Sequence, residues 1–306
     1  MSTYRNTHVT PSVRAANLLK TALASSPESV APHTTAVISE AHALIAGEEP
    51  YLENYTSDLL VPQSHLDGTG LSDAEVRGAW TSLLNATGDT DWLQLHADGK
   101  TQDRLGSAMC SGAYEAVVLQ NFALMAKPAR VLEIGVFTGT ATLALALLPT
   151  VQQIVALDVE PYLKEFCEPF WASAGVSDKI DFKIAPALET LATMSKSGCE
   201  PFDLVFIDAD KPSYGAYVQA LLDLGLLSED GVILADNTLY KGCWVAPEMF
   251  ESTELELDEV ERKQLQIQKE AMDGINEFNA FVRNHPELEA CVLPIRDGIT
   301  IIRRKL

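Results

Sequence analysis

The sequence predicts an α/β protein with a seven-stranded, mostly parallel sheet, a C-terminal antiparallel hairpin and an N-terminal helical extension. Three observations predict this fold. As far as residue 126, apolar residues recur at helical spacing. After Lys127-Pro128, short and nearly continuous apolar runs alternate with helical stretches, as in a buried parallel sheet. The last segment contains two strand-like runs joined through Asp297-Gly298, which is a strong hairpin signal.

The helical extension is predicted from four segments, each with apolar residues at helical spacing. Ser72 followed by Glu75 is a capping-box pattern, which predicts that the third helix begins there. No repeat of the length found in repeat proteins is visible. The segments are RAANLLKTALA (14–24), TTAVISEAHALIAG (34–47), LSDAEVRGAWTSLLNATG (71–88) and AYEAVVLQNFALMA (113–126).

Five apolar runs are predicted to be the parallel strands, and the segment 289–305 supplies the antiparallel pair. A dinucleotide dehydrogenase more often continues the β–α alternation to its end. Parallel strands finished by a C-terminal hairpin are typical of Rossmann-like, S-adenosylmethionine-dependent methyltransferases. The five runs are RVLEIG (130–135), QIVALD (153–158), KIDFKIA (179–185), FDLVFID (202–208) and GVILADN (231–237).

Composition and charge argue against several classes of function. The formal net charge of -21 argues against binding to nucleic acid or to an anionic membrane surface. The five cysteines include no CxxC pair, which indicates a reducing compartment rather than disulfides or a zinc site. The N-terminus lacks an apolar signal segment, and the longest apolar run, LALALL (143–148), is too short to span a bilayer. We therefore expect a cytoplasmic protein.

A glycine-bearing turn after the first predicted strand is the candidate cofactor site. In VLEIGVFTGTATLALAL (131–147), Gly135 and Gly139 let the backbone pass close to a ligand, although such glycines are equally common for structural reasons alone. In an open parallel sheet the ligand crevice lies beyond the carboxyl ends of the strands, where this turn falls. The spacing G-x-x-x-G differs from the dinucleotide fingerprint G-x-G-x-x-G.

Asp158 ends the second predicted strand and is a candidate for binding both ribose hydroxyls of a nucleoside cofactor. The alternative is that it caps the following helix. An acidic strand end disfavours a pyrophosphate and suits a cationic sulfonium, so the pocket favours S-adenosylmethionine over NAD.

Acidic and amide side chains end the fourth and fifth predicted strands. Asp208 and Asp210 follow one strand, and Asp236-Asn237 follow the other. If these strands are neighbours, their oxygens converge at one edge of the sheet, where carboxylates repel unless a cation lies between them. Oxygen ligands without histidine or thiolate suit Mg²⁺ first, with Mn²⁺ or Ca²⁺ possible. Either pair taken alone is more often a cap or a solvated strand end.

Lys211 follows this acidic pair and is a candidate general base. A divalent cation binds two adjacent substrate oxygens well and lowers the pKa of a hydroxyl, whose proton Lys211 would take. Methyl transfer then depends mainly on the alignment of oxygen, methyl and sulfur. The alternative role for Lys211 is a salt bridge to Asp210.

Four separated motifs resemble the cation-dependent O-methyltransferases of the caffeoyl-CoA and catechol type. They are VLEIGVFTG, LVFIDADK, ADNTLYKG and LPIRDGITIIRR, and the likeness runs from about Met109 to the C-terminus. This divides the chain into an extension, 1–108, and a methyltransferase domain, 109–306. The resemblance implies a homodimer that acts on a small-molecule acceptor.

The resemblance also implies roles for individual residues. Lys211 would be the base, with Asp208 beside it at the catalytic centre. The implied metal ligands are Asp208, Asp236 and Asn237. The implied cofactor-binding residues are Met109, Ser111, Glu133, Gly135, Val136, Asp158, Ala187, Asp208 and Asp210.

A narrower likeness concerns the acceptor. AGEEPYLENYTS (46–57) and MCSGAYEAVVLQNF (109–122) resemble segments of the O-methyltransferases that methylate a demethyl-deoxygadusol precursor of mycosporine-like sunscreens. That acceptor is a small, uncharged cyclohexenone with adjacent oxygens, which suits chelation and an acidic protein. The alternatives are a catechol or phenylpropanoid acceptor of the caffeoyl type, and a non-catalytic protein that binds S-adenosylmethionine and acts through protein contacts.

Some positions depart from the caffeoyl-CoA pattern. Ala141 stands where a serine is common, which removes one cofactor hydrogen bond. Tyr240 replaces a tryptophan and Lys241 an asparagine, so these two residues and Trp244 are candidate acceptor contacts, although Trp244 is equally interpreted as core. The stretch between Ala246 and Asn279 looks longer, and its acidity argues against CoA thioesters.

Overall fold

A seven-stranded sheet runs through the described part of the chain, with the strand order β3-β2-β1-β4-β5-β7-β6. The structure is a computed structural model, and it describes residues 19–20, 41, 70–240 and 259–305. Five strands are parallel, and β7 pairs antiparallel with both β5 and β6. The predicted fold is therefore confirmed. The strands are β1 (Arg130–Ile134), β2 (Gln153–Asp158), β3 (Ile180–Ile184), β4 (Phe202–Ile207), β5 (Leu227–Ala235), β6 (Leu288–Leu293) and β7 (Ile299–Arg304).

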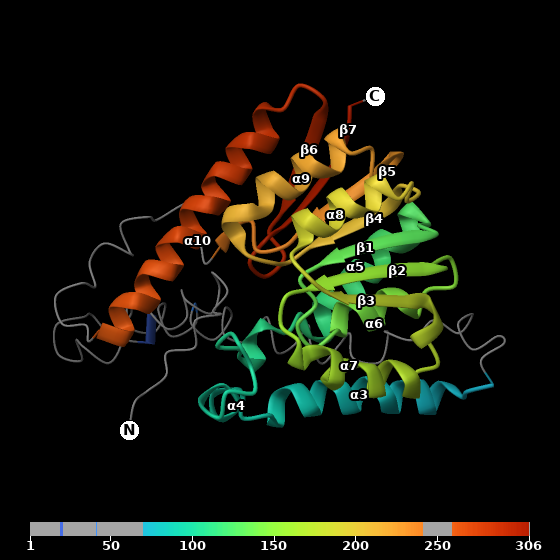
Figure 1. Ribbon diagram of the computed structural model, residues 1–306, viewed down its shortest axis with the longest axis vertical. Helices are drawn as coiled ribbons and strands as arrows, with labels where there is room; N and C mark the ends of the chain where they lie inside the picture. The colour runs from blue at the N-terminus through green and yellow to red at the C-terminus, as the bar shows by residue number, and fades with distance from the viewer. Residues whose placement is uncertain (1–18, 21–40, 42–69, 241–258, 306) are drawn as a thin grey trace.

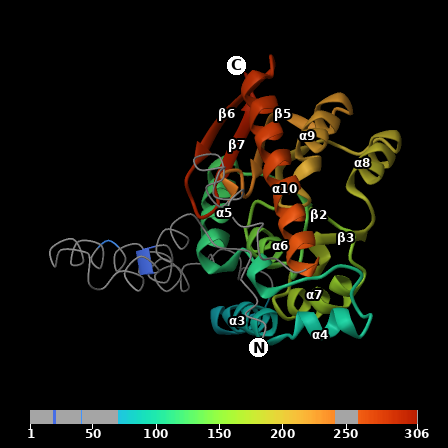
Figure 2. The ribbon, with the colours of Figure 1, turned by 90° about the vertical axis from the view of Figure 1, so that its left-hand side faces the viewer.

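Helices cover both faces of this sheet (Figure 1). On one face lie α5 (Gly112–Ala126), α6 (Thr140–Ala146) and α7 (Tyr162–Ser173), with α3 (Asp73–Asp89) packed on α7. On the other face lie α8 (Ala187–Lys196), α9 (Tyr214–Asp223) and α10 (Glu259–Asn284), so that α5 and α9 are on opposite sides in Figure 2. The chain also forms α4 (Trp92–Ala97) and three short 3₁₀ turns, η2 (Ser107–Met109), η3 (Ser177–Lys179) and η4 (Lys211–Ser213).

The central strands β1, β2 and β4 are mostly apolar and buried because they face helices on both sides. Along β4, Leu204 and Phe206 pack into one hydrophobic cluster, and Val205 and Ile207 pack into the other. All four side chains are buried. This explains why the predicted strands were continuous apolar runs rather than alternating ones.

One strand begins earlier than its sequence pattern predicts. β5 starts at Leu227 rather than at Gly231, and Phe202 of β4 pairs with Leu227 across a shift in register. The intervening residues 228–230 are polar and lie at the exposed start of the strand. An apolar pattern does not reveal this part of the strand.

The described part of the helical extension packs on the α/β core. Ser72 and Glu75 form the predicted capping box of α3: the Glu75 amide donates to Ser72 Oγ at 3.3 Å, and the Ser72 amide donates to Glu75 Oε2 at 2.7 Å. Val76 and Leu83 of α3 are fully buried in the cluster that also holds α6 and α7. The two predicted helices before residue 48 fall almost wholly outside the described residues, and the division at residue 108 stays a prediction.

Within the described ranges, no helix is both long enough and apolar enough to cross a membrane.

Candidate functional site

A cavity of about 510 Å³ opens at the carboxyl ends of the parallel strands. This is the position expected for a ligand in an open α/β sheet. The loops after β1, β2, β4 and β5 supply its walls, together with the segment from Asp103 to Ser111. Every residue predicted to bind the cofactor or a metal lines this single cavity: Met109, Ser111, Glu133, Gly135, Val136, Asp158, Ala187, Asp208, Asp210, Asp236 and Asn237.

Gly135 brings the loop after β1 against the loop after β4. Its φ is +90°, and a Cβ there would lie 1.9 Å from the carbonyl oxygen of Asp208. The glycine is therefore required for the approach of one backbone to another, and this contact places Asp208 at the floor of the cavity. Gly139 is constrained in the same way by Trp171, whose ring would lie 2.5 Å from an added Cβ.

Asp158 binds the backbone around it with both carboxylate oxygens. Its Oδ2 accepts hydrogen bonds from the amides of Val136 and Phe137 at 2.9 and 3.0 Å. Its Oδ1 accepts from the amides of Val159 and Glu160 at 2.7 and 3.0 Å. Four donors fill the acceptor positions of a carboxylate. Asp158 thus organises the turn after β1 in this conformation, and its contact with ribose hydroxyls stays a prediction.

Glu160, two residues after Asp158, also lines the cavity and binds the backbone at the start of the segment 103–111. Its Oε2 accepts hydrogen bonds from the amides of Gln102 and Asp103 at 2.6 and 3.1 Å. Because Asp103 and the residues up to Ser111 line the cavity, this buried carboxylate fixes one end of the segment that covers it. The sequence did not mark Glu160, since its two amide partners in the cavity wall lie more than 50 residues away along the chain, although Glu160 also accepts from the nearby amide of Tyr162.

Glu133 lies at the end of β1 with no exposed surface, and neither carboxylate oxygen has a hydrogen-bond partner among the described residues. Burial raises the pKa of Glu133 to about 8, while the neighbouring Thr142 acts to lower it. A buried acceptor pair that faces a cavity fits a ligand which donates hydrogen bonds or carries positive charge.

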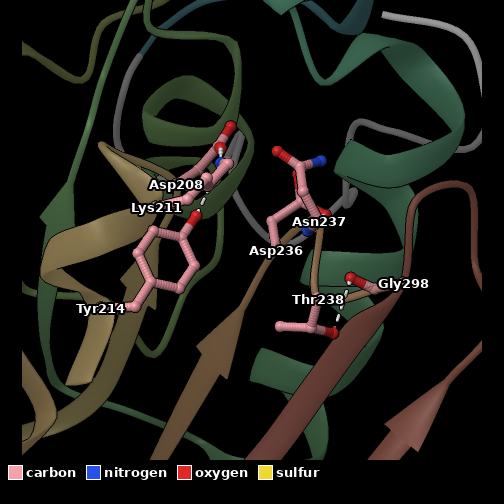
Figure 3. A network of polar contacts seen from close by, with 7 residues as sticks. All are labelled: Asp208, Lys211, Tyr214, Asp236, Asn237, Thr238 and Gly298. Atoms are coloured by element: carbon pink, nitrogen blue, oxygen red, sulfur yellow. Dashed lines mark hydrogen bonds and ion pairs between the residues drawn. The ribbon is translucent and has the colours of Figure 1, made fainter. Parts of the chain in front are cut away.

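Asp208 and Lys211 form an ion pair at the end of β4, with Nζ 2.8 Å from Oδ1 (Figure 3). The same ammonium donates to the Tyr214 hydroxyl at 2.7 Å. Burial acts to lower the pKa of Lys211, but Asp208, Tyr214 and Asp236 outweigh it and hold the pKa above its ordinary value. Lys211 is therefore charged in this conformation. Its partner is Asp208, and not the Asp210 of the alternative interpretation.

Asp210 is held by hydroxyl groups instead. It accepts hydrogen bonds from Ser213 and from Tyr217, which lie in the turn and the helix that follow. Burial, together with this contact, raises the pKa of Tyr217. These bonds fix the loop after β4 against α9.

Asp236 and Asn237 follow β5, next to Asp208, because β4 and β5 are adjacent and in register to Ile207 and Ala235. Burial and the charge of Asp208 raise the pKa of Asp236 to about 7. Asn237 adopts a left-handed φ of 57°, and its backbone and side-chain amides donate to Asp236 at 2.6 and 2.9 Å. The predicted convergence of these strand ends is observed.

The family model described as O-methyltransferase matches residues 91–305. The chain belongs to the O-methyltransferase family. This family match covers the cavity, both strand ends and the C-terminal hairpin. The protein is an S-adenosylmethionine-dependent O-methyltransferase with the class I fold.

Two relatives illustrate the similarity. Caffeoyl-CoA O-methyltransferase 1 of Eucalyptus globulus is 37% identical over 198 residues, which cover 64% of this chain and 75% of that protein. Tricin synthase 1 of Oryza sativa subsp. japonica is 37% identical over 202 residues, which cover 64% of this chain and 75% of that protein.

Solved structures of methyltransferases share the fold. PaMTH1 of Podospora anserina, with bound SAH, has a TM-score of 0.56 and 28% identity, covering 77% of this chain and 98% of that one. TomG of Streptomyces achromogenes, in complex with SAM, has a TM-score of 0.58 and 22% identity, covering 84% of this chain and 96% of that one. At 22% identity the second likeness shows the fold alone.

The strand ends of this O-methyltransferase fit a hard divalent cation. Asp208 and Asp236 are carboxylates in one cavity, and after burial the negative charge of Asp208 is the second cause that raises the pKa of Asp236. Asn237 adds an amide oxygen of the kind that Mg²⁺, Mn²⁺ and Ca²⁺ accept. Among the described residues, no cluster of three or more His, Cys, Asp or Glu side chains is able to hold a metal, so the cation set proposed here depends on the amide oxygen of Asn237 beside the two aspartates.

The candidate acceptor residues are placed only in part. Tyr240, at the end of the described loop after β5, packs on the cluster formed by α8, α9 and α10, and it is not among the cavity-lining residues. Lys241 and Trp244 lie outside the described residues. The acceptor role of all three stays a prediction.

Glu115 and Arg296 are further charged residues of the cavity wall that sequence reasoning did not mark. Glu115 is a lone acid inside the apolar helix segment 113–126, which is the one signal that marks it. Arg296 immediately precedes the hairpin signal Asp297-Gly298 and carries no other mark in the sequence.

Proposed function

We propose that this enzyme transfers the methyl group of S-adenosylmethionine to one hydroxyl of a small molecule with adjacent oxygens, held on a divalent cation. The observation that supports the proposal is the meeting of Asp208, Asp236, Asn237 and Lys211 in the cavity that also contains the predicted cofactor residues. A reaction between two bound molecules requires such a shared site.

Asp208, Asp236 and Asn237 would hold the cation, preferably Mg²⁺, with Mn²⁺ or Ca²⁺ as alternatives. When bound, a divalent cation supplies Lewis acidity, which lowers the pKa of a coordinated hydroxyl. The protein supplies the alignment of donor and acceptor in a cavity partly screened from water by the segment 103–111.

Lys211 would accept the proton of the acceptor hydroxyl. Its contact with Asp208 stabilises the charged form, so this contact must weaken before Lys211 acts as a base. Tyr214, which receives the second hydrogen bond of Lys211, keeps the amine directed along the cavity edge. Proton transfer by a positioned side chain typically contributes a factor of about 10² to 10⁴.

For the acceptor we propose a demethyl-deoxygadusol-type cyclohexenone, on the strength of the sequence likeness in segments 46–57 and 109–122. A catechol or phenylpropanoid acceptor is the second candidate. It is favoured by the relatives, whose names are caffeoyl-CoA O-methyltransferase and tricin synthase. The homodimer and the cytoplasmic location expected from the sequence remain predictions.

The test is methyl transfer from S-adenosylmethionine to three acceptors, demethyl-deoxygadusol, a simple catechol and caffeoyl-CoA, with and without EDTA. We expect turnover of a vicinal-oxygen acceptor that EDTA abolishes and Mg²⁺ restores. Turnover that EDTA leaves unchanged would rule out the cation. Binding of S-adenosylmethionine without turnover of any acceptor in the panel would instead favour a non-catalytic binding protein.

A further inference from the structure

The segment 103–111 is a wall of the cavity that consists of loop and one short turn. Asp103, Arg104 and Met109 line the cavity and are also exposed, so this wall lies at the opening of the cavity. The turn η2 bonds within the segment, where the amide of Met109 donates to the carbonyl oxygen of Gly106 at 2.9 Å. Contacts at the two ends of the segment therefore matter for its position over the cavity.

An ion pair fixes the carboxyl-terminal end of this wall. Arg296 Nη1 donates to the carbonyl oxygen of Ser111 and to Glu115 Oε2, the latter at 3.1 Å. Ser111 is buried, and Glu115 lies on the helix α5 that follows it, with its side chain 3% exposed. Opening this end would take the cationic partner away from a buried carboxylate, which is costly. We therefore expect this end to stay in place.

Glu160 holds the amino-terminal end. Its Oε2 accepts hydrogen bonds from the amides of Gln102 and Asp103 at 2.6 and 3.1 Å. Gln102 and Asp103 are exposed, so their amides find water as soon as these bonds break. Glu160 is 2% exposed, but its Oε1 still accepts from the amide of Tyr162 at 3.2 Å. This end is thus the one that opens at the lower cost.

We propose that Glu160 is a positioning residue that holds the segment 103–111 over the bound cofactor, and that S-adenosylmethionine and SAH exchange when its two bonds to this segment open. The inference rests on the proposed use of this cavity for S-adenosylmethionine and does not depend on the cation. Loops that close over a ligand often set the rate of product release. Glu160 would act on that rate through backbone amides, without contact to the reacting atoms.

Asp203 provides a matched control at the opposite end of the sheet. Its Oδ2 also accepts from two backbone amides that are distant in the sequence, those of Ala129 and Arg130, at 2.9 and 3.0 Å. These contacts join the starts of β1 and β4, and none of the three residues is among those that line the cavity. Asp203→Ala therefore removes hydrogen bonds of the same kind away from the cofactor.

The experiment measures SAH association and dissociation rates by surface plasmon resonance on the full chain, with chemical denaturation of each variant. We expect Glu160→Ala to raise the SAH dissociation rate by about tenfold or more, as the loss of hydrogen bonds to a charged group implies. Glu160→Gln should restore a rate close to that of the wild type, because its side-chain oxygen still accepts from both amides. Gln102→Pro removes one donor, leaves Glu160 in place and should also raise the rate. Asp203→Ala should lower stability and leave the rate unchanged.

The outcomes separate a role in cofactor exchange from a role in stability alone. An unchanged dissociation rate in Glu160→Ala overturns the inference. An equal rise in Asp203→Ala also overturns it, since general loosening of the fold would then explain the effect. If Glu160→Ala shows no cooperative unfolding, Gln102→Pro decides, and a wild-type rate in that variant counts against the inference. A wild-type protein that binds no SAH would instead refute the proposed function of the cavity, and this inference with it.

Discussion

Lys211 donates a hydrogen bond from Nζ to Oδ1 of Asp208 at 2.8 Å, so the predicted base is paired with a predicted cation ligand. The two side chains are 12% and 22% exposed, which makes this pair far less screened than a surface salt bridge. The ability of Asp208 to bind a cation and the protonation state of Lys211 are therefore coupled. A change in this one contact should alter both cation binding and proton transfer.

The first prediction concerns Lys211. Lys211→Ala should lower kcat by about 10² to 10⁴, mostly at low pH, where the acceptor hydroxyl is still protonated. Lys211→Arg is the matched control, because it keeps a cation beside Asp208 but does not accept a proton at accessible pH. The pH profile of kcat checks both variants. If the arginine variant regains wild-type turnover, the residue acts only through its salt bridge.

The second prediction concerns Asp236, whose pKa burial and Asp208 raise to about 7. A cation requires the ionised carboxylate, so Mn²⁺ affinity should increase as the pH rises through about 7. Asp236→Ala should abolish EDTA-sensitive turnover while SAH affinity stays the same. Calorimetry with Mn²⁺ at several pH values, and with SAH, measures these effects. Ordinary turnover in Asp236→Ala would remove this residue from the ligand set.

The third prediction concerns Gly274 of α10, which lies against the turn that carries Lys211. A Cβ at Gly274 would lie 2.6 Å from Pro212 Cα and 3.0 Å from the Lys211 carbonyl carbon. Gly274→Ala should therefore displace η4, cost about 1–3 kcal/mol in the free energy of unfolding, and lower kcat.

Gly78→Ala is the control for this variant, because Gly78 lies on the exposed side of α3 with nothing within 4 Å of an added Cβ. It should stabilise the protein by up to about 1 kcal/mol and leave kcat unchanged. Chemical denaturation and steady-state kinetics give the comparison. Wild-type stability and kcat in Gly274→Ala would show that α10 does not set the position of Lys211.

The fourth prediction concerns Glu133, whose pKa burial raises from its ordinary value of 4.5 to about 8. Between these values the carboxyl group is protonated in the folded protein and ionised in the unfolded chain. Unfolding then releases a proton, so stability without cofactor should fall as pH rises across this window. A ligand group that donates to Glu133 favours the ionised form, so SAH affinity should rise with pH over the same range.

Glu133→Gln should remove both pH dependences and weaken SAH binding. Thermal unfolding and calorimetry from about pH 5 to about pH 9, centred on the window of the raised pKa, measure them. If SAH affinity depends on pH in the same way in Glu133→Gln and in the wild type, another group is responsible.

Several features of the fold and site followed from local sequence. The strand runs, the hairpin at Asp297-Gly298 and the capping box of Ser72 depend on near neighbours, so periodicity and turn chemistry reveal them. Asp208 and Asp236 could be assigned to one edge of the sheet because residues that end parallel strands meet there. The separated motifs also indicated the O-methyltransferase family.

The tertiary structure decided how these residues are used. Lys211 pairs with Asp208 rather than with Asp210. Both carboxylate oxygens of Asp158 accept hydrogen bonds from backbone amides. Glu115 meets Arg296 across 181 positions of sequence. Such contacts depend on which distant segments the folded sheet brings together and on which polar groups it buries, whereas sequence periodicity records only near neighbours. The sequence by itself therefore determined the elements and the chemical types at the site, and only folding determined their partners and their charge states.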